Sequence, residues 1–353
     1  MVAAGPRRYA WRNHSASPAL VQIERGASAK PGQLQESSLL SDGATMTHGT
    51  HEFIDDPRNL SIKIWINGEL FAREQARVSV FDAGFVLGDG VWEGLRVQAG
   101  HPLFLDAHLD RLYEGAKAIA LNIGMNRAQL TGAIYATLAA NQMRDGVHIR
   151  LMVTRGIKRT PYQDPRVCIG PATLVILPEF KTPLPQTATR GLKLYTVHVR
   201  RGAPDVQDPK LNSHSKLNCI TACIQAYGAG ADEALMLDPD GFVATCNSTH
   251  FFIVRRGQVW TSTGDYCLAG ITRANVLTIC REAGIPAFEK RFSLTECYAA
   301  DEAFVTGTFA GVVPVRELDG RVFSDGARGP LVERLQALYQ GFAARDVASR
   351  AGP

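Results

Sequence analysis

Two separated stretches of the sequence carry residue types that can bind a phosphate group. In "GITR", Gly270 precedes Ile271 and Thr272, where an amphipathic helix is expected to begin. The free N–H groups and the positive dipole end of a helix N-terminus attract anions, although a plain helix cap uses the same residues. "TGTFAG", from Thr306 to Gly311, combines small residues and hydroxyls after a predicted strand. It fits an anion-binding turn, and it also fits an ordinary tight turn.

Arg111 and the stretch "VFDAGFVLGDGVWEGLRV" are further candidates for a binding site. Arg111 lies in an amphipathic pattern, where an arginine usually faces solvent. If it points inward, its guanidinium can bind a phosphate through two hydrogen bonds. The second stretch, residues 80–97, mixes four glycines with aromatic and acidic residues, which favours a pocket wall or an interface.

The elements that must position these residues fall into two halves. Alternating apolar residues predict strands, and apolar residues at helical spacing predict helices. The expected strands are residues 61–68, 76–82, 147–156, 172–179, 192–201, 233–238, 249–262 and 302–315, and the expected helices are residues 106–121, 127–143, 217–230, 271–285 and 330–346. This order predicts an α/β protein with mixed sheets. We expect a disordered tail over residues 1–58, a small α/β domain over 59–180, a linker over 181–190 and a larger α/β domain over 191–345.

The expected tail is rich in Ser, Ala, Gly and Arg and has no hydrophobic period, which is typical of disorder. Its arginines resemble those of a mitochondrial transit peptide, but Glu24, Glu36 and the missing amphipathic pattern speak against one. A start of translation at Met46 is the other interpretation.

Composition limits the classes of function. The chain of 353 residues is 45% hydrophobic and 20% charged, which is normal for a soluble globular protein. A net charge of +4 is small for a nucleic-acid-binding protein, and no apolar run approaches the ~20 residues of a membrane-spanning helix. Seven scattered cysteines without a CxxC pair predict no metal site and a reducing, cytoplasmic environment.

The order of the motifs resembles the fold-type IV pyridoxal-phosphate enzymes, which include the branched-chain and D-amino acid aminotransferases and aminodeoxychorismate lyase. The resemblance covers about residues 62–339 and is carried by "FDAGFVLGDGVWEGLR", "HLDRL", "GADEALMLDPDGFVAT", "LAGITRANV", "ADEAFVTGTFAGVVPV" and "GPLVERLQALY". It implies a two-domain fold, a homodimer, and pyridoxal 5'-phosphate bound in the larger domain.

The resemblance also implies roles for single residues. Arg111 matches the arginine that binds the cofactor phosphate, Ile271 and Thr272 match the ligands at the helix start, and Thr308 matches the threonine that completes the phosphate cup. Thr245 falls where the family has a glutamate that pairs with the pyridine nitrogen. A hydroxyl is a weaker partner for that nitrogen, so we expect a weaker electron sink.

A second departure concerns the lysine that joins the cofactor as an imine. In "QDPKLNSHSKLNCI", the family's lysine falls on Asn212. We favour Lys216 as the catalytic lysine, because one helical turn from Asn212 would bring it to the same side. Lys210 is the alternative, and a third option is that no lysine of the chain forms an imine.

Four residues are candidates for binding the substrate. Phe85 and Trp92 match aromatic positions of the pocket wall, and Arg96 and Arg159 could bind a carboxylate. The resemblance implies an aminotransferase that moves an amino group from a branched-chain or D-amino acid to a 2-oxo acid. The alternatives are a lyase like the deoxychorismate enzyme, or a protein that binds pyridoxal phosphate without turnover.

Overall fold

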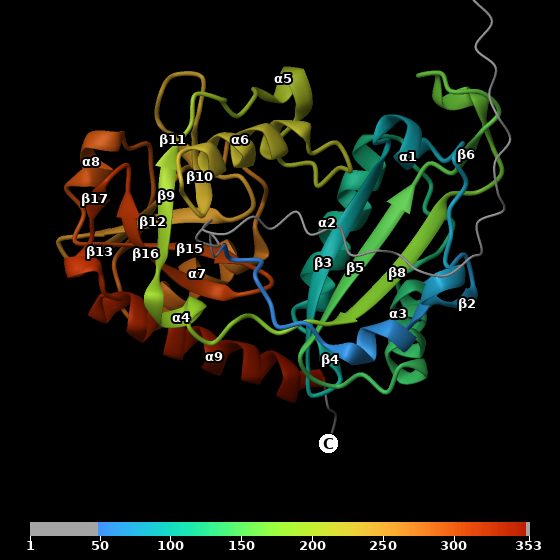
Figure 1. Ribbon diagram of the computed structural model, residues 1–353, viewed down its shortest axis with the longest axis horizontal. Coiled ribbons are helices and arrows are strands. Elements are labelled where there is room, and N and C mark those ends of the chain that lie inside the picture. The colour runs from blue at the N-terminus through green and yellow to red at the C-terminus, as the bar shows by residue number, and fades with distance from the viewer. Residues whose placement is uncertain (1–48, 351–353) are drawn as a thin grey trace, which may run out of the picture. The chain divides into compact units, whose positions relative to one another are not determined.

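The computed structural model describes residues 49–350, and the sequence interpretations of a transit peptide and of a start at Met46 lie outside this range. The sheets of Figure 1 divide along the chain, one before and one after the segment of residues 181–191. The fold is of the mixed α/β class that the sequence predicts. The domain boundaries that we expected stay a prediction.

The first sheet is antiparallel and has the strand order β2-β1-β8-β5-β3-β4. Its strands are β1 (Lys63–Ile66), β2 (Glu69–Ala72), β3 (Gly90–Gln98), β4 (His101–Pro102), β5 (Val147–Thr154) and β8 (Thr173–Phe180). The turn at Asn67 and Gly68 joins β1 to β2, which confirms the hairpin that Asn-Gly predicts.

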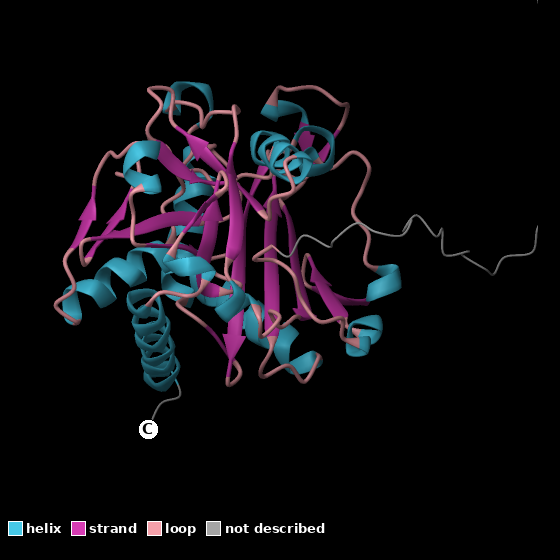
Figure 2. Cartoon of the chain, turned by 60° about the vertical axis from the view of Figure 1, so that its left-hand side comes forward, coloured by secondary structure: helices cyan, strands magenta, loops and turns pink. Residues whose placement is uncertain are grey.

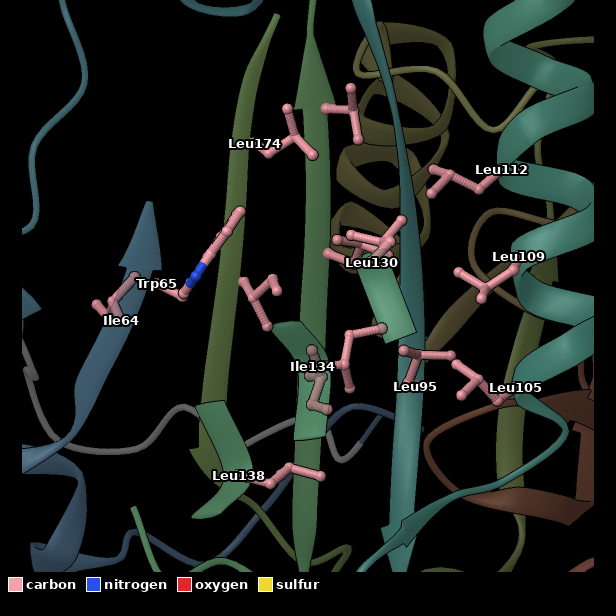
Figure 3. Close-up of a cluster of buried hydrophobic side chains, with 14 of the residues drawn as sticks. Ile64, Trp65, Leu95, Leu105, Leu109, Leu112, Leu130, Ile134, Leu138 and Leu174 are labelled. Atoms are coloured by element: carbon pink, nitrogen blue, oxygen red, sulfur yellow. The ribbon is translucent and has the colours of Figure 1, made fainter. Parts of the chain in front are cut away.

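Two helices, α2 (Leu105–Ala118) and α3 (Arg127–Ala140), cover one face of this sheet. Leu105, Leu109 and Leu112 of α2 repeat at helical spacing and point toward the strands in Figure 3. They bury almost completely against the sheet and α3. Burial of such side chains contributes on the order of 1.5–3 kcal/mol each, so this core fixes the sheet that carries part of the site.

The second sheet is mixed and larger. Its order is β11-β10-β9-β16-β15-β12-β13-β14, and β17 pairs with β16. The strands are β9 (Leu192–Thr196), β10 (Glu233–Leu237), β11 (Val243–Cys246), β12 (His250–Arg255), β13 (Gln258–Thr261), β14 (Ala287–Glu289), β15 (Glu302–Gly307), β16 (Gly311–Leu318) and β17 (Arg321–Val322). A separate pair, β6 (Ile157–Lys158) and β7 (Cys168–Ile169), completes the described strands.

The remaining helices lie around the strands in Figure 2. They are α1 (Ala83–Leu87), α4 (Thr187–Arg190), α5 (Pro204–Gln207), α6 (Leu217–Gly228), α7 (Ile271–Glu282), α8 (Leu294–Tyr298) and α9 (Pro330–Arg350), with 3-10 turns at Pro57–Ser61, Arg73–Gln75, Pro165–Val167 and Ser324–Gly326. Near its end, α9 reaches α2, because Asp346 accepts a hydrogen bond from the Phe104 N–H (2.7 Å). Across residues 49–350, no helix has both the length and the apolar composition needed to cross a membrane.

Two expectations about local structure differ from the structure. The strand predicted at residues 76–82 is absent, because pairing is limited to an isolated bridge between Asp82 and Ile157 at its end, and Val78 and Val80 are exposed. The expected tail was to continue to residue 58, yet residues 49–58 include ordered contacts. Ile54 donates its N–H to the Thr182 carbonyl (3.3 Å), and Asp56 caps the turn that begins at Pro57.

Candidate active site

A cavity of about 510 Å³ is lined by residues from both sheets. This volume suits a cofactor together with a small substrate. No aspartate or glutamate is among the described residues that line it, whereas five cationic side chains are. These are Arg111, Arg150, Lys181, Arg201 and Lys216. The charge of the walls therefore favours anionic ligands.

Strand alternation explains why the first sheet carries both core and site. Val91, Leu95 and Val97 of β3 belong to the buried core, so Trp92 and Gly94 lie on the opposite face and line the cavity. The neighbouring strand β5 repeats this pattern, with His148 and Arg150 on the cavity side. The Arg150 guanidinium lies 3.8 Å from the Trp92 ring centre, a cation–π contact that fixes both side chains.

The N-terminus of α7 lies at the cavity wall. Gly270 is the N-cap residue and has no side chain that could accept hydrogen bonds from the first backbone N–H groups of the helix. Because Ile271 and Thr272 line the cavity, these backbone N–H groups remain available to an external anion. A methyl group at position 270 would come within 2.2 Å of His250 Nε2, so glycine is required for the close approach of helix and strand.

Arg111 is held at this helix start. It donates from Nε and Nη2 to Glu93 (2.8 and 2.7 Å) and from Nη1 to the Ala269 carbonyl (2.7 Å). The buried Glu93 also accepts from His108 Nδ1 (2.7 Å). Burial alone would raise the pKa of Glu93, but these hydrogen bonds hold it below its usual value. The ionised Glu93 thus orients Arg111 at the cavity wall, and the role that the sequence resemblance implies for Arg111, a ligand of the cofactor phosphate, stays a prediction.

The turn between β15 and β16 forms another part of the wall. Thr308 lines the cavity, and the buried Thr306 hydroxyl beside it has no partner among the described residues. Arg96, which does not line this cavity, supports the turn by donating to the Phe309 carbonyl. The side chains of Arg111 and Thr308 and the helix start of α7 form a donor set that fits a phosphate group.

Lys216 enters the cavity beside Asn212. Its Nζ donates to Asn212 Oδ1 (3.1 Å) and lies 5.4 Å from the Trp92 ring centre. Asn212 is itself fixed on β3, because its Nδ2 donates to the Trp92 carbonyl (2.6 Å) and its carbonyl accepts the Trp92 N–H (3.0 Å). The expected reason for this proximity was wrong: α6 begins at Leu217, so the two residues do not share a helical turn. A bend at His214 brings the side chains together instead.

The surroundings of Lys216 weaken its hold on a proton. Burial lowers the pKa of Lys216 to about 8, and the positive charges of Arg201, Arg111 and Arg150 act in the same direction. An amine with such a pKa exists in both forms near neutral pH, which suits a nucleophile or a general base.

Thr245 lies on β11 and lines the cavity. Its hydroxyl donates to the Thr249 carbonyl (2.8 Å), so its oxygen can only accept a hydrogen bond from a ligand. The neighbouring His250 is buried, and this burial, together with the charges of Arg273, Arg111 and Arg201, lowers its pKa to about 3. His250 is therefore neutral behind the helix start.

Several predicted site residues lie away from this cavity. Phe85 is 72% exposed on α1, and Arg159 is exposed after β6, where its N–H donates to the Val167 carbonyl (2.9 Å). Arg96 borders a second cavity of about 560 Å³ beside α9. Lys210, the alternative lysine, is exposed. The structure thus brings Lys216, and not Lys210, into the cavity.

The sequence analysis missed other residues of the wall. Arg150 had a signal, because "VHIRLMV" alternates and places Arg150 opposite the core-facing Val147 and Ile149. Lys181 follows β8 in a proline-rich segment and had none. Among residues 49–350, no group of three or more His, Cys, Asp or Glu side chains is placed to hold a metal ion.

Comparison with known proteins gives the family. The model of the amino-transferase class IV family matches residues 90–318. The chain is 42% identical over 284 residues to branched-chain-amino-acid aminotransferase-like protein 2 of Arabidopsis thaliana, covering 80% of this chain and 51% of that protein. It is 39% identical to a putative branched-chain-amino-acid aminotransferase of Methanocaldococcus jannaschii, covering 79% and 96%.

A solved structure agrees with these relatives. The branched-chain aminotransferase of the thermophilic archaeon Thermoproteus uzoniensis, solved with norvaline, superposes with a TM-score of 0.73 at 32% identity, covering 81% of this chain and 96% of that one. The chain therefore belongs to the class IV aminotransferase family and has its two-domain fold. It spans about half the length of the Arabidopsis relatives that it matches, 51% in each case.

Proposed function

We propose that the chain is a pyridoxal-phosphate-dependent aminotransferase that moves an amino group from a branched-chain or D-amino acid to a 2-oxo acid. The observation that carries the proposal is the Nζ of Lys216, held inside the cavity by Asn212 (3.1 Å) and given a pKa of about 8. When bound, pyridoxal phosphate supplies an aldehyde that accepts the amino group and a ring that stabilises negative charge beside it.

The residues of the chain supply binding and proton transfer. Arg111, the N–H groups of Ile271 and Thr272, and Thr308 would hold the phosphate. The Nζ of Lys216 would hold the aldehyde end of the cofactor and, when free, would take the proton at the substrate α-carbon and return it. The Thr245 hydroxyl donates to the Thr249 carbonyl, so its oxygen would accept a hydrogen bond from the ring nitrogen only when that nitrogen is protonated, and it would hold this proton more weakly than a carboxylate.

The substrates bring at least one carboxylate. Arg150 and Lys181 are cations of the wall, and their main electrostatic acid neighbour is Glu179. They are our candidates for carboxylate binding in place of Arg96 and Arg159, which lie outside the cavity. Trp92 orients Arg150 through its ring face.

We further propose a cytoplasmic homodimer. The seven cysteines are all free thiols, which is the usual state in a reducing compartment. Val80, Phe81 and Phe85 are exposed within one short stretch of the chain, and exposed apolar side chains are more stable when another subunit covers them. Light scattering on a size-exclusion column tests the dimer: a monomer at micromolar concentration would refute it.

Asn212 and Thr245 also support an alternative, a protein that binds the cofactor without turnover, because both depart from the family pattern at the reacting end. A lyase keeps the same cofactor site. Dependence of turnover on an added 2-oxo acid distinguishes an aminotransferase from a lyase.

Borohydride reduction of the protein with pyridoxal phosphate, followed by peptide mapping, tests the proposal. We expect a pyridoxyl group on Lys216. A label on Lys210 would keep the enzyme and change its catalytic lysine, and tightly bound cofactor without any label would favour the binding protein.

A further inference from the structure

The segment Gly49–Ile54 lies against the cavity, before the residues that the family model matches. One end is fixed on the second sheet, because the Thr50 hydroxyl donates to Glu233 of β10. The other end is fixed after β8, where Phe53 forms a bridge with Pro183 and the Ile54 N–H donates to the Thr182 carbonyl (3.3 Å). The segment therefore spans the distance between the two sheets.

Contacts with the cavity wall are made by aromatic rings. The His51 ring stacks on Phe309, with centroids 5.9 Å apart and an interplanar angle of 7°. Lys181 Nζ lies over both the Phe53 ring (4.4 Å) and the Phe309 ring (5.0 Å). Thr50, His51, Lys181 and Phe309 all line the cavity, so the segment supplies part of its surface.

His51 lies on the Arg150 side of Lys216. Arg150 and Lys216 Nζ both lie over the Trp92 ring (3.8 and 5.4 Å). His148, on the same face of β5 as Arg150, packs against the Phe309 ring (5.6 Å) on which His51 stacks. The phosphate ligands Arg111 and Ile271 mark the cofactor end of the cavity. A substrate that reacts at Lys216 and whose carboxylate binds Arg150 and Lys181 therefore lies against the His51 ring.

The imidazole is a neutral part of this wall. Desolvation of the ring by the surrounding protein, followed by the positive charges of Lys181 and Arg150, lowers the pKa of His51 to about 4. His148 packs edge-on against the same Phe309 ring (5.6 Å) and is neutral for similar reasons, with a pKa of about 3. His51 therefore occupies volume and offers one donor and one acceptor, without adding charge at neutral pH.

We propose that Gly49–Ile54 is a wall of the substrate site and that His51 limits the length of the substrate side chain. The inference rests on the proposed function. A ring in the wall of a substrate site excludes longer chains by contact, and one methylene at such a boundary is commonly worth about tenfold in selectivity.

Straight-chain carboxylic acids from propionate to heptanoate test this without turnover. Their dissociation constants are measured by calorimetry on the full chain loaded with pyridoxal phosphate. In His51→Ala we expect the preference for heptanoate over propionate to rise by about tenfold, with the cofactor absorbance unchanged. The matched control is His198→Ala, since His198 is exposed and lies outside the cavity. An unchanged preference in His51→Ala overturns the inference.

The second test is turnover of the parent and His51→Ala with the corresponding 2-oxo acids, where the ratio of kcat/KM for long over short substrates should rise in His51→Ala. If the parent protein shows no turnover, the proposed function is contradicted, and the calorimetric dissociation constants still test whether His51 limits the length of the bound chain. The two failures are therefore distinguishable.

Thr50 tests whether the segment is held in place. Thr50→Val loses the hydroxyl that donates to Glu233, whereas Thr50→Ser keeps one. We expect a glutamate-specific protease to cleave after Glu52 about tenfold faster in Thr50→Val, through local opening of the segment, and at the parental rate in Thr50→Ser. Equal rates in the parent and in Thr50→Val would show that this anchor does not hold the wall.

Discussion

The Nζ of Lys216 donates a hydrogen bond of 3.1 Å to Oδ1 of Asn212, the residue at which the sequence resemblance leads us to expect the family's lysine. The carboxamide also donates to the Trp92 carbonyl (2.6 Å), which fixes it against β3. Asn212 thus acts as a support for an amine that comes from four residues further along the chain.

The first prediction concerns the position of the amine. Lys216→Met should lose the pyridoxyl label after borohydride reduction, and Asn212→Lys in the same chain should restore a label, now at position 212, because both side chains reach the same part of the cavity. Lys210→Met is the control and should keep the label on Lys216, since Lys210 is exposed. Peptide mapping by mass spectrometry gives the result. If Lys216→Met carried a full pyridoxyl label on Lys210, the prediction would be wrong.

A second prediction concerns pH. With a pKa of about 8 instead of 10.5, Lys216 is unprotonated in about one molecule in four at pH 7.5, compared with about one in a thousand for an ordinary lysine. The rate at which a small amine-reactive reagent modifies Lys216 should therefore rise with pH and level off above a midpoint near 8. Competitive labelling at a series of pH values measures it. A midpoint near 10.5 would mean that burial and the three arginines do not act on this amine.

The third prediction concerns Gly270. Gly270→Ala places a methyl group within 2.2 Å of His250 Nε2, so the start of α7 must shift. We expect a loss of about 1–3 kcal/mol in the free energy of unfolding and at least a tenfold weaker affinity for pyridoxal phosphate. Denaturant unfolding and fluorescence titration measure these changes.

Gly132→Ala is the matched control, because Gly132 lies within α3 and nothing is within 4 Å of the added methyl group. This substitution should be neutral or stabilise the protein by up to about 1 kcal/mol. If both variants bind the cofactor like the parent, the helix start is not part of its site.

The fourth prediction concerns acid stability. The pKa of His250 is lowered from 6.5 to about 3 in the folded protein, so between these pH values the unfolded chain binds a proton that the folded chain does not. Stability therefore falls as the pH falls from 6.5 toward 3, by on the order of 2 kcal/mol at pH 5. In His250→Asn, the difference in unfolding free energy between pH 7 and pH 5 should shrink by about that amount.

His198→Asn, at an exposed position, serves as the control and should keep the parental difference. Denaturant titrations at the two pH values are sufficient. If His250→Asn keeps the parent's difference in unfolding free energy between pH 7 and pH 5, the imidazole is not buried in its neutral form.

Local pattern predicted much of the fold and part of the site. Helical spacing gave α2, and Gly270 at the predicted start of α7 indicated the anion site, because these features depend on neighbouring residues. The strand predicted at residues 76–82 failed for the opposite reason, since a strand exists only where a partner pairs with it.

The contacts that complete the site could not be predicted in this way. Lys216 meets Asn212 because Asn212 is pinned to Trp92, a residue from the other half of the chain. Thr50 contacts Glu233, which lies 183 positions further along the sequence, and no periodic pattern in residues 49–58 predicts this contact. Such contacts depend on tertiary packing, which leaves no local trace in the sequence.

Alternation along β3 and β5 has a consequence for how this protein can change. Val91, Leu95, Ile149 and Leu151 hold the fold together, and Trp92 and Arg150 face the ligand from the positions between them. Substitutions on one set of positions can therefore alter specificity while the other set maintains stability. Inserting a single residue in either strand would move the core side chains to the cavity face and the cavity side chains to the core, so that stability and binding would be lost together. New substrate specificities can therefore evolve here through substitutions but not through insertions.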